Sequence, residues 1–75
     1  MVRTREYLRR FYSDETIDDE IEQVKSAKFG ECVFYLLEGE SDDYIMTVLA
    51  LAGVSYEQEE SDGMIFFYKV QPEAE

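Results

Sequence analysis

The sequence predicts a small α+β domain with the element order α-α-β-α-β-β. Three observations lead to this prediction: two serines followed by pairs of acidic residues, a short apolar run typical of a strand, and an Asp-Gly pair between two strand-like segments. The length of 75 residues allows one domain, residues 1–75, with a small core. A hydrophobic content of 45% with six Tyr and five Phe favours a folded chain over a disordered acidic one.

Two helices are expected in the first third of the chain. Residues 4–12 predict a short helix that begins at Thr4, with aromatic and apolar side chains on one face and arginines on the other. A second helix should begin after Ser13 and extend to about Lys28, with Gly30 ending it. Its apolar residues recur at helical spacing and form one face, which consists of Ile17, Ile21 and Val24.

The middle of the chain predicts a strand and a third helix. The apolar run Cys32–Leu37 is too short for an ordinary helix, and we expect a strand that is covered on both faces. Ser41, which precedes two aspartates, should begin a helix that ends at Gly53. Apolar residues occupy most of this helix, so it should be the most buried helix or meet a partner on one side.

The last third of the chain predicts a β-hairpin. The pair Asp62-Gly63 is typical of a type I′ turn, whose two central residues need positive φ. Such a turn pairs Glu59 with Phe66 and Glu57 with Tyr68. Because carboxylates opposite aromatic rings are poor partners in a buried sheet, either a three-residue loop shifts this register or the glutamates lie at an exposed edge.

The order of the elements predicts the topology of the sheet. A right-handed β-α-β crossover leaves the strands 32–37 and 54–60 parallel, with 64–70 inserted between them and antiparallel to both. The expected result is a three-stranded mixed sheet of order 1-3-2 packed with helices, followed by a frayed tail at 72–75. The residues expected to be among the most buried are Phe34, Leu36, Ile45, Val48, Leu49, Phe66 and Tyr68.

The residue types argue against an enzyme. The chain has no histidine, which is the usual proton carrier near neutral pH, and its serines serve as helix caps or turn residues. Cys32 is expected to be an inert thiol buried in a strand. Glu38, Glu40, Asp42 and Asp43 lie close together but lack the spacing of an EF-hand, so we expect a solvated loop there. We therefore expect no catalytic residue, no cofactor and no metal.

Cysteine content and hydropathy indicate the compartment. A single thiol cannot close an intramolecular disulfide, which favours a reducing, cytoplasmic location. No stretch approaches the ~18 apolar residues of a membrane span. No signal peptide is recognisable at the start of the sequence.

Charge is distributed unevenly along the chain, whose formal net charge is −11. Residues 1–12 carry four arginines and one glutamate, whereas residues 13–75 carry three lysines and seventeen acidic side chains, a net charge of −14. Direct binding to nucleic acid is disfavoured, because neutralisation of phosphates supplies most of that affinity. The N-terminal arginines resemble a basic patch for RNA or membranes, but pairing with carboxylates of the second helix is the simpler interpretation. The expected partners are basic proteins.

Two acidic clusters form the predicted partner-binding site. The second helix carries a stripe of carboxylates opposite its apolar face, repeating about every 5–6 Å along the axis, which is of the same order as the distance between consecutive phosphates in a nucleic-acid strand. An ordinary solvated face is the alternative interpretation of this stripe. The predicted partner-binding residues are Asp14, Glu15, Asp18, Asp19 and Glu22 on the helix, and Glu57, Glu59, Glu60 and Asp62 on the hairpin.

The expected function is that of a non-enzymatic, acidic protein-binding module. It would occupy a basic surface of a nucleic-acid-binding protein or enzyme, as an inhibitor or a mimic of nucleic acid, with Tyr and Phe side chains as anchors. In size, charge and α+β content the chain is similar in kind to small acidic inhibitors of phages and mobile elements, and to bacterial immunity proteins and acidic antitoxins. A structural or regulatory homodimer is the alternative, pairing through apolar surface around Tyr44, Met46, Ala50 and the strand 64–70.

The excess of negative charge predicts that moderate salt stabilises the fold. Repulsion among the carboxylates of residues 13–75 weakens the compact state, and screening over a Debye length of about 8–10 Å relieves it. The melting temperature, followed by circular dichroism, should rise from about 10 mM to about 150 mM NaCl. A melting temperature that falls steadily over this range would contradict the prediction.

Overall fold

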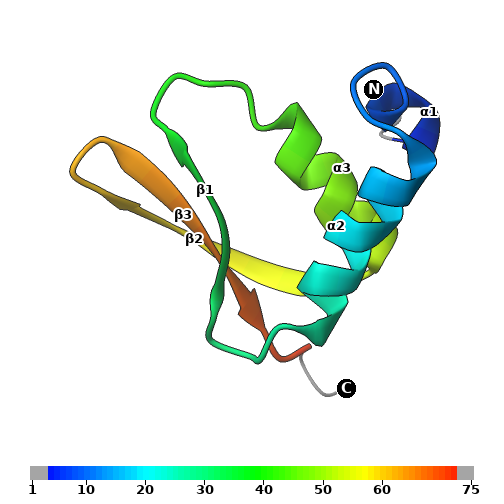
Figure 1. Ribbon diagram of the computed structural model, residues 1–75. Helices are drawn as coiled ribbons and strands as arrows, with labels where there is room; N and C mark the ends of the chain where they lie inside the picture. The colour runs from blue at the N-terminus through cyan, green and yellow to red at the C-terminus, as the bar shows by residue number, and fades with distance from the viewer. Residues whose placement is uncertain (1–3, 73–75) are drawn as a thin grey trace.

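The computed structural model describes residues 4–72, whose three helices lie on one side of a three-stranded sheet (Figure 1). The helices are α1 (Arg5–Leu8), α2 (Asp14–Ser26) and α3 (Asp43–Ala52), and the strands are β1 (Cys32–Leu37), β2 (Ser55–Ser61) and β3 (Met64–Val70). The predicted α+β class and element order are confirmed. Most of the predicted C-terminal tail, residues 73–75, lies outside the described residues. None of the described helices is long and apolar enough to cross a membrane.

The first helix is shorter than the sequence predicts. It ends at Leu8 rather than at Tyr12, and the side chain of Thr4 makes no capping hydrogen bond. Leu8 is fully buried, whereas Phe11 and Tyr12 are exposed after the helix ends. Because a helix this short is marginal on its own, the packing of Leu8 in the core is what holds it in place.

The second helix begins where the sequence predicts but ends earlier. The hydroxyl of Ser13 accepts a hydrogen bond from the backbone N–H three residues later, at 3.3 Å, as an N-cap does. The predicted core face, Ile17, Ile21 and Val24, is buried. The helix ends at Ser26, short of the predicted Lys28, because Ala27 is extended. Gly30 does not end the helix but lies in the turn that follows it, with φ +94°.

The third helix is the most buried of the three. Its buried residues are Ile45, Thr47, Val48, Leu49 and Ala52. The hydroxyl of Thr47 donates a hydrogen bond to the backbone carbonyl of Asp43 at 2.6 Å, so this polar group is satisfied inside the core. Gly53 ends the helix in the left-handed conformation, with φ +68°, as predicted.

The sheet has the predicted strand order, β1-β3-β2. It is antiparallel rather than mixed, because β3 lies between the other two strands and is antiparallel to each. Asp62 and Gly63 both have positive φ, +52° and +76°, as a type I′ turn requires. The register is the one that this turn predicts, with Ser61 opposite Met64 next to the turn.

The register of the hairpin decides which face of β3 is buried. Residues directly opposite each other in an antiparallel pair project to the same face, so Glu57 and Glu59 share a face with Tyr68 and Phe66. If that face met the helices, the core would contain two carboxylates without partners. The structure instead buries Phe67, which is 1% exposed. The prediction that Phe66 and Tyr68 are among the most buried residues is therefore wrong, and Phe34, which was expected with them, is only half-buried.

The first strand is covered on one face only. Leu36 is buried and Phe34 is half-buried on the side of the helices, whereas Tyr35 and Leu37 are 66% and 56% exposed on the other side. The prediction of a strand covered on both faces is wrong, because no described element packs on the second face. Cys32 is exposed rather than buried, and it lies at the start of the strand.

A buried lysine joins the sheet to the second helix. Lys69 is 7% exposed and projects from β3 toward the helices. Its ammonium donates hydrogen bonds to the backbone carbonyls of Lys25, at 2.7 Å, and Ala27, at 2.8 Å. Carbonyls at the end of a helix lack partners within the helix and lie at the negative end of its dipole. The ammonium also lies 5.4 Å from the ring centroid of Phe29, so the turn after α2 surrounds this charge.

Replacing Lys69 with methionine should destabilise the fold. Methionine retains an apolar stem but leaves the carbonyls of Lys25 and Ala27 without their donor, so the free energy of unfolding should fall by about 2 kcal/mol. The matched control is Lys28→Met, at an exposed lysine, which should change it by no more than about 0.5 kcal/mol. Urea unfolding followed by circular dichroism measures both variants. Equal unfolding midpoints for the parent chain and Lys69→Met would show that the ammonium does not hold α2 to the sheet.

Candidate protein-binding surfaces

The side of the sheet away from the helices carries aromatic and apolar side chains. We define the open face as eight residues that project to this side: Tyr35, Leu37, Met64, Phe66, Tyr68 and Val70, with Glu57 and Glu59. The ring centroids of Tyr35 and Phe66 are 6.4 Å apart, and those of Phe66 and Tyr68 are 6.5 Å apart. These three rings form a continuous ladder. A contiguous apolar patch of this kind is typical of an interaction surface.

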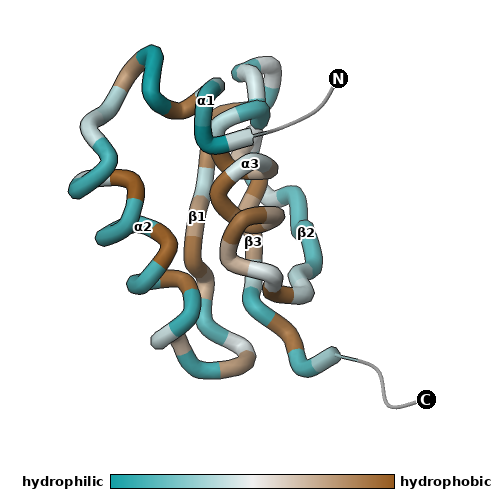
Figure 2. The backbone as a smooth tube through the Cα atoms, turned by 90° about the vertical axis from the view of Figure 1, so that its right-hand side faces the viewer, coloured by the Kyte–Doolittle hydropathy of each residue, from teal (hydrophilic) through white to brown (hydrophobic). Residues whose placement is uncertain are grey.

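Two carboxylates border the aromatic ladder of the open face. Glu57 lies opposite Tyr68 and Glu59 opposite Phe66, and both glutamates are exposed. Figure 2 shows β2 as a largely hydrophilic strand, in contrast to the hydrophobic residues of β1 and β3. Within residues 4–72, neither glutamate has an ion-pair partner. A shallow groove of about 500 Å³ lies here, lined by Gly30, Glu57, Gln58, Glu59, Tyr68 and Val70. The open face is thus both aromatic and anionic.

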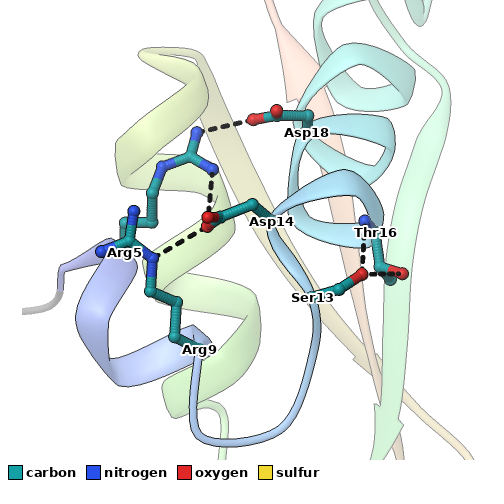
Figure 3. Close-up of polar contacts among 6 residues, drawn as sticks. All are labelled: Arg5, Arg9, Ser13, Asp14, Thr16 and Asp18. Carbon is teal, nitrogen blue, oxygen red and sulfur yellow. Dashed lines mark hydrogen bonds and ion pairs between the residues drawn. The ribbon is translucent and has the colours of Figure 1, made fainter.

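The acidic stripe of α2 is partly neutralised by the N-terminal arginines (Figure 3). Arg5 pairs with Asp18 at 2.7 Å and lies 3.6 Å from Asp14, and the Nε of Arg9 donates to Asp14 at 2.8 Å. The simpler interpretation of the arginines, pairing within the molecule, is therefore confirmed. The carboxylates of the stripe that have no ion-pair partner within residues 4–72 are Glu15, Asp19 and Glu22.

The predicted partner-binding residues lie on separate surfaces of the molecule. The stripe of α2 is on the helix side of the sheet, whereas Glu57 and Glu59 belong to the open face (Figure 1). Glu60 projects from β2 to the opposite side from Glu59, and Asp62 lies in the turn. One flat partner surface therefore cannot contact the stripe together with Glu57 and Glu59.

The aromatic part of the open face is what the sequence analysis missed. Tyr35 and Leu37 were expected in a strand covered on both faces, and Phe66 and Tyr68 in the core. The hairpin register identifies this face, because it places Glu57 beside Tyr68 and its neighbour Glu59 beside the other aromatic ring that β3 presents on this face.

The apolar residues that a homodimer would use do not form one surface. Tyr44 packs against Tyr12 and Phe34, with ring centroids 5.2 and 6.3 Å away. Burial, and the neighbouring carboxylate of Glu20, raise the pKa of Tyr44 to about 12. The thioether of Met46 accepts a hydrogen bond from the hydroxyl of a tyrosine in β2. Both α3 side chains are thus engaged inside the domain and are separated by the sheet from the open face.

The loop between β1 and α3 uses its polar groups locally. The carboxylate of Glu40 accepts a hydrogen bond from the backbone N–H of Leu37 at 2.8 Å, and the hydroxyl of Ser41 accepts one from that of Asp43 at 3.3 Å. Within the described part of the chain, no group of three or more Cys, Asp or Glu side chains could hold a metal ion.

No protein-family model matches the sequence, and no curated protein or solved structure is significantly similar to it. The open face and the acidic stripe, rather than a relative, therefore carry what can be inferred about function.

The ion pairs of Asp14 predict a specific titration. The hydrogen bond from Arg9 lowers the pKa of Asp14 below its ordinary value of 3.8, and the charges of Arg9 and Arg5 act in the same direction. A lowered pKa in the folded state means that the pairing stabilises the fold above pH 3.8, and that this contribution is lost as the pH falls through the lowered value. Arg9→Gln should therefore raise the pKa of Asp14 toward 3.8.

Carbon-detected NMR of the Asp14 carboxyl measures this pKa directly. The matched control is Arg10→Gln, which removes an equal charge from a neighbouring exposed residue. The same Asp14 titration in the parent and in Arg9→Gln would show that this ion pair is not formed in solution.

Proposed function

We propose that this chain is a non-enzymatic, acidic protein-binding module, that its partner is a basic protein, and that the open face is its main binding surface. The observation that supports this best is the ladder of Tyr35, Phe66 and Tyr68, which no element of residues 4–72 covers. The carboxylates of Glu57 and Glu59 lie in register beside it and have no ion-pair partner within the same residues. Aromatic side chains are favoured as anchors at the centre of interfaces, and carboxylates select for basic partners. A reducing, cytoplasmic location belongs to the same proposal.

The acidic stripe of α2 has a secondary role in this proposal. Glu15, Asp19 and Glu22 add to a net charge of −11, and such a field increases the association rate of a basic partner. Asp14 and Asp18 contribute less, because the arginines neutralise them. Proteins that bind nucleic acid present basic surfaces of the kind required. Occupying such a surface, as an inhibitor that competes with nucleic acid, is the form of function that this charge distribution supports best.

A homodimer through the open face is less well supported. The sheet has one strand of six residues and two of seven. At a spacing of about 4.8 Å between strands and about 3.3 Å per residue, it gives a footprint of roughly 300 Å². A standard interface buries about 800 Å² on each partner. A second copy would also bring another net charge of −11 against Glu57 and Glu59. The footprint therefore fits a short segment of a partner better than a second copy.

The proposed function predicts a salt-dependent association with a basic protein. Affinity capture with the full chain, from cells that encode it, identifies the partner by elution with a salt gradient. Surface plasmon resonance with the purified partner should then show an association rate that falls at least about tenfold between low and physiological salt. Excess chain should also displace nucleic acid from the partner.

Two outcomes would contradict this proposal. An association rate that does not depend on salt would exclude a partner selected by charge. Light scattering of the free chain at micromolar concentration should show a monomer near 8.8 kDa, and a stable species of twice that mass would favour the homodimer.

A further inference from the structure

We propose that the open face binds an extended segment of the basic partner in which arginines alternate with other residues, in an Arg-x-Arg pattern. In this complex each guanidinium lies on an aromatic ring of β3 and pairs with a carboxylate of β2. This inference rests on the proposed function and specifies the chemistry that the open face recognises.

The cross-strand pairs of the hairpin form two equivalent binding positions. Phe66 lies opposite Glu59, and Tyr68 lies opposite Glu57. The Cβ atoms of such pairs are about 4.5–5.5 Å apart, and a cation is attracted to a ring within about 6 Å of its centroid. A cation over either ring is therefore also within reach of the adjacent carboxylate. Each pair offers a flat apolar surface and a negative charge to one cationic side chain.

The spacing of these two positions matches an extended peptide. The ring centroids of Phe66 and Tyr68 are 6.5 Å apart. Residues i and i+2 of an extended chain project to the same face about 6.6–6.8 Å apart, whereas adjacent residues project to opposite faces. Two arginines separated by one residue can therefore occupy both positions, and two adjacent arginines in an extended segment cannot. The open face thus selects for alternation as well as for charge.

Arginine fits these positions better than lysine. The guanidinium is planar, stacks on aromatic faces and can donate two parallel hydrogen bonds to one carboxylate. The ammonium of lysine is a compact and strongly hydrated charge that does not stack. Tyr35 extends the aromatic ladder toward β1, where it can cover the aliphatic stem of an arginine side chain.

The test measures the binding of synthetic peptides to the full chain by fluorescence anisotropy. The first peptide carries two arginines separated by one threonine in a threonine background, the second has the same composition with its two arginines adjacent, and the third replaces the arginines of the first with lysines. The alternating arginine peptide should bind about tenfold more tightly than the peptide with adjacent arginines. It should bind at least about threefold more tightly than the lysine peptide. Its affinity should fall as salt increases.

Two double variants of equal charge locate the binding surface. Glu57→Gln with Glu59→Gln removes both carboxylates of the open face, and Glu15→Gln with Asp19→Asn removes two carboxylates of α2 that have no ion-pair partner in the described part of the chain. The first pair should weaken binding of the alternating peptide by about tenfold and the second by less than about threefold. Tyr68→Leu, which retains an apolar side chain but removes a ring, should also weaken it. Heteronuclear NMR spectra establish that each variant is folded.

The outcomes separate this inference from the proposed function. Equal weakening by the two double variants, or equal binding of the alternating peptide and the peptide with adjacent arginines, would overturn the inference and leave a module that recognises net charge. Tighter binding of the lysine peptide would overturn it as well. If no basic peptide binds even at low salt, both the inference and the proposed function are wrong.

Discussion

The type I′ turn at Asp62-Gly63 sets the register of β2 against β3, and the arrangement of both faces of the sheet depends on this register. It places two glutamates of β2 on the same face as Phe66 and Tyr68. Burying two carboxylates without partners costs far more than leaving two rings half-exposed. The helices therefore cover the other face, where Phe67 fills the core, and the face with the glutamates stays open.

Lys69 is buried because the helices cover the face of β3 that carries Phe67. Alternation along β3 puts Lys69 on the face of Phe67, so the core has to accommodate an ammonium. The end of α2 makes this tolerable, because its carbonyls lack partners within the helix and accept hydrogen bonds from Lys69. This arrangement buries one ammonium that has two hydrogen-bond acceptors. The opposite arrangement would bury the carboxylates of Glu57 and Glu59 without donors. Lys69 also fixes the position of the end of α2 relative to the sheet, because it joins β3 to the carbonyls of Lys25 and Ala27.

Local signals in the sequence predicted much of the fold but not the burial of the sheet. The cap at Ser13, the left-handed Gly53 and the Asp-Gly turn depend on nearby residues, so they could be predicted correctly. Burial of β3 could not be predicted from its own residues, because Phe66 and Tyr68 form a more apolar set than Phe67 and Lys69. The sequence predicts the carboxylates of the open face as candidate binding residues, but it places their aromatic neighbours in the core. Only the hairpin register, together with the cost of burying carboxylates, identifies the aromatic face as the exposed one.

Solvent access to the two faces of the sheet decides whether the open face is available to a partner. Leu36 and Leu37 are adjacent in β1 and report on the two faces, since they are 7% and 56% exposed. Relaxation of their methyl groups by a soluble paramagnetic gadolinium chelate measures how closely solvent approaches each one. We expect strong enhancement for Leu37 and little for Leu36 in the free chain. Equal protection of the two leucines would contradict this account, because it would show that the open face is already covered.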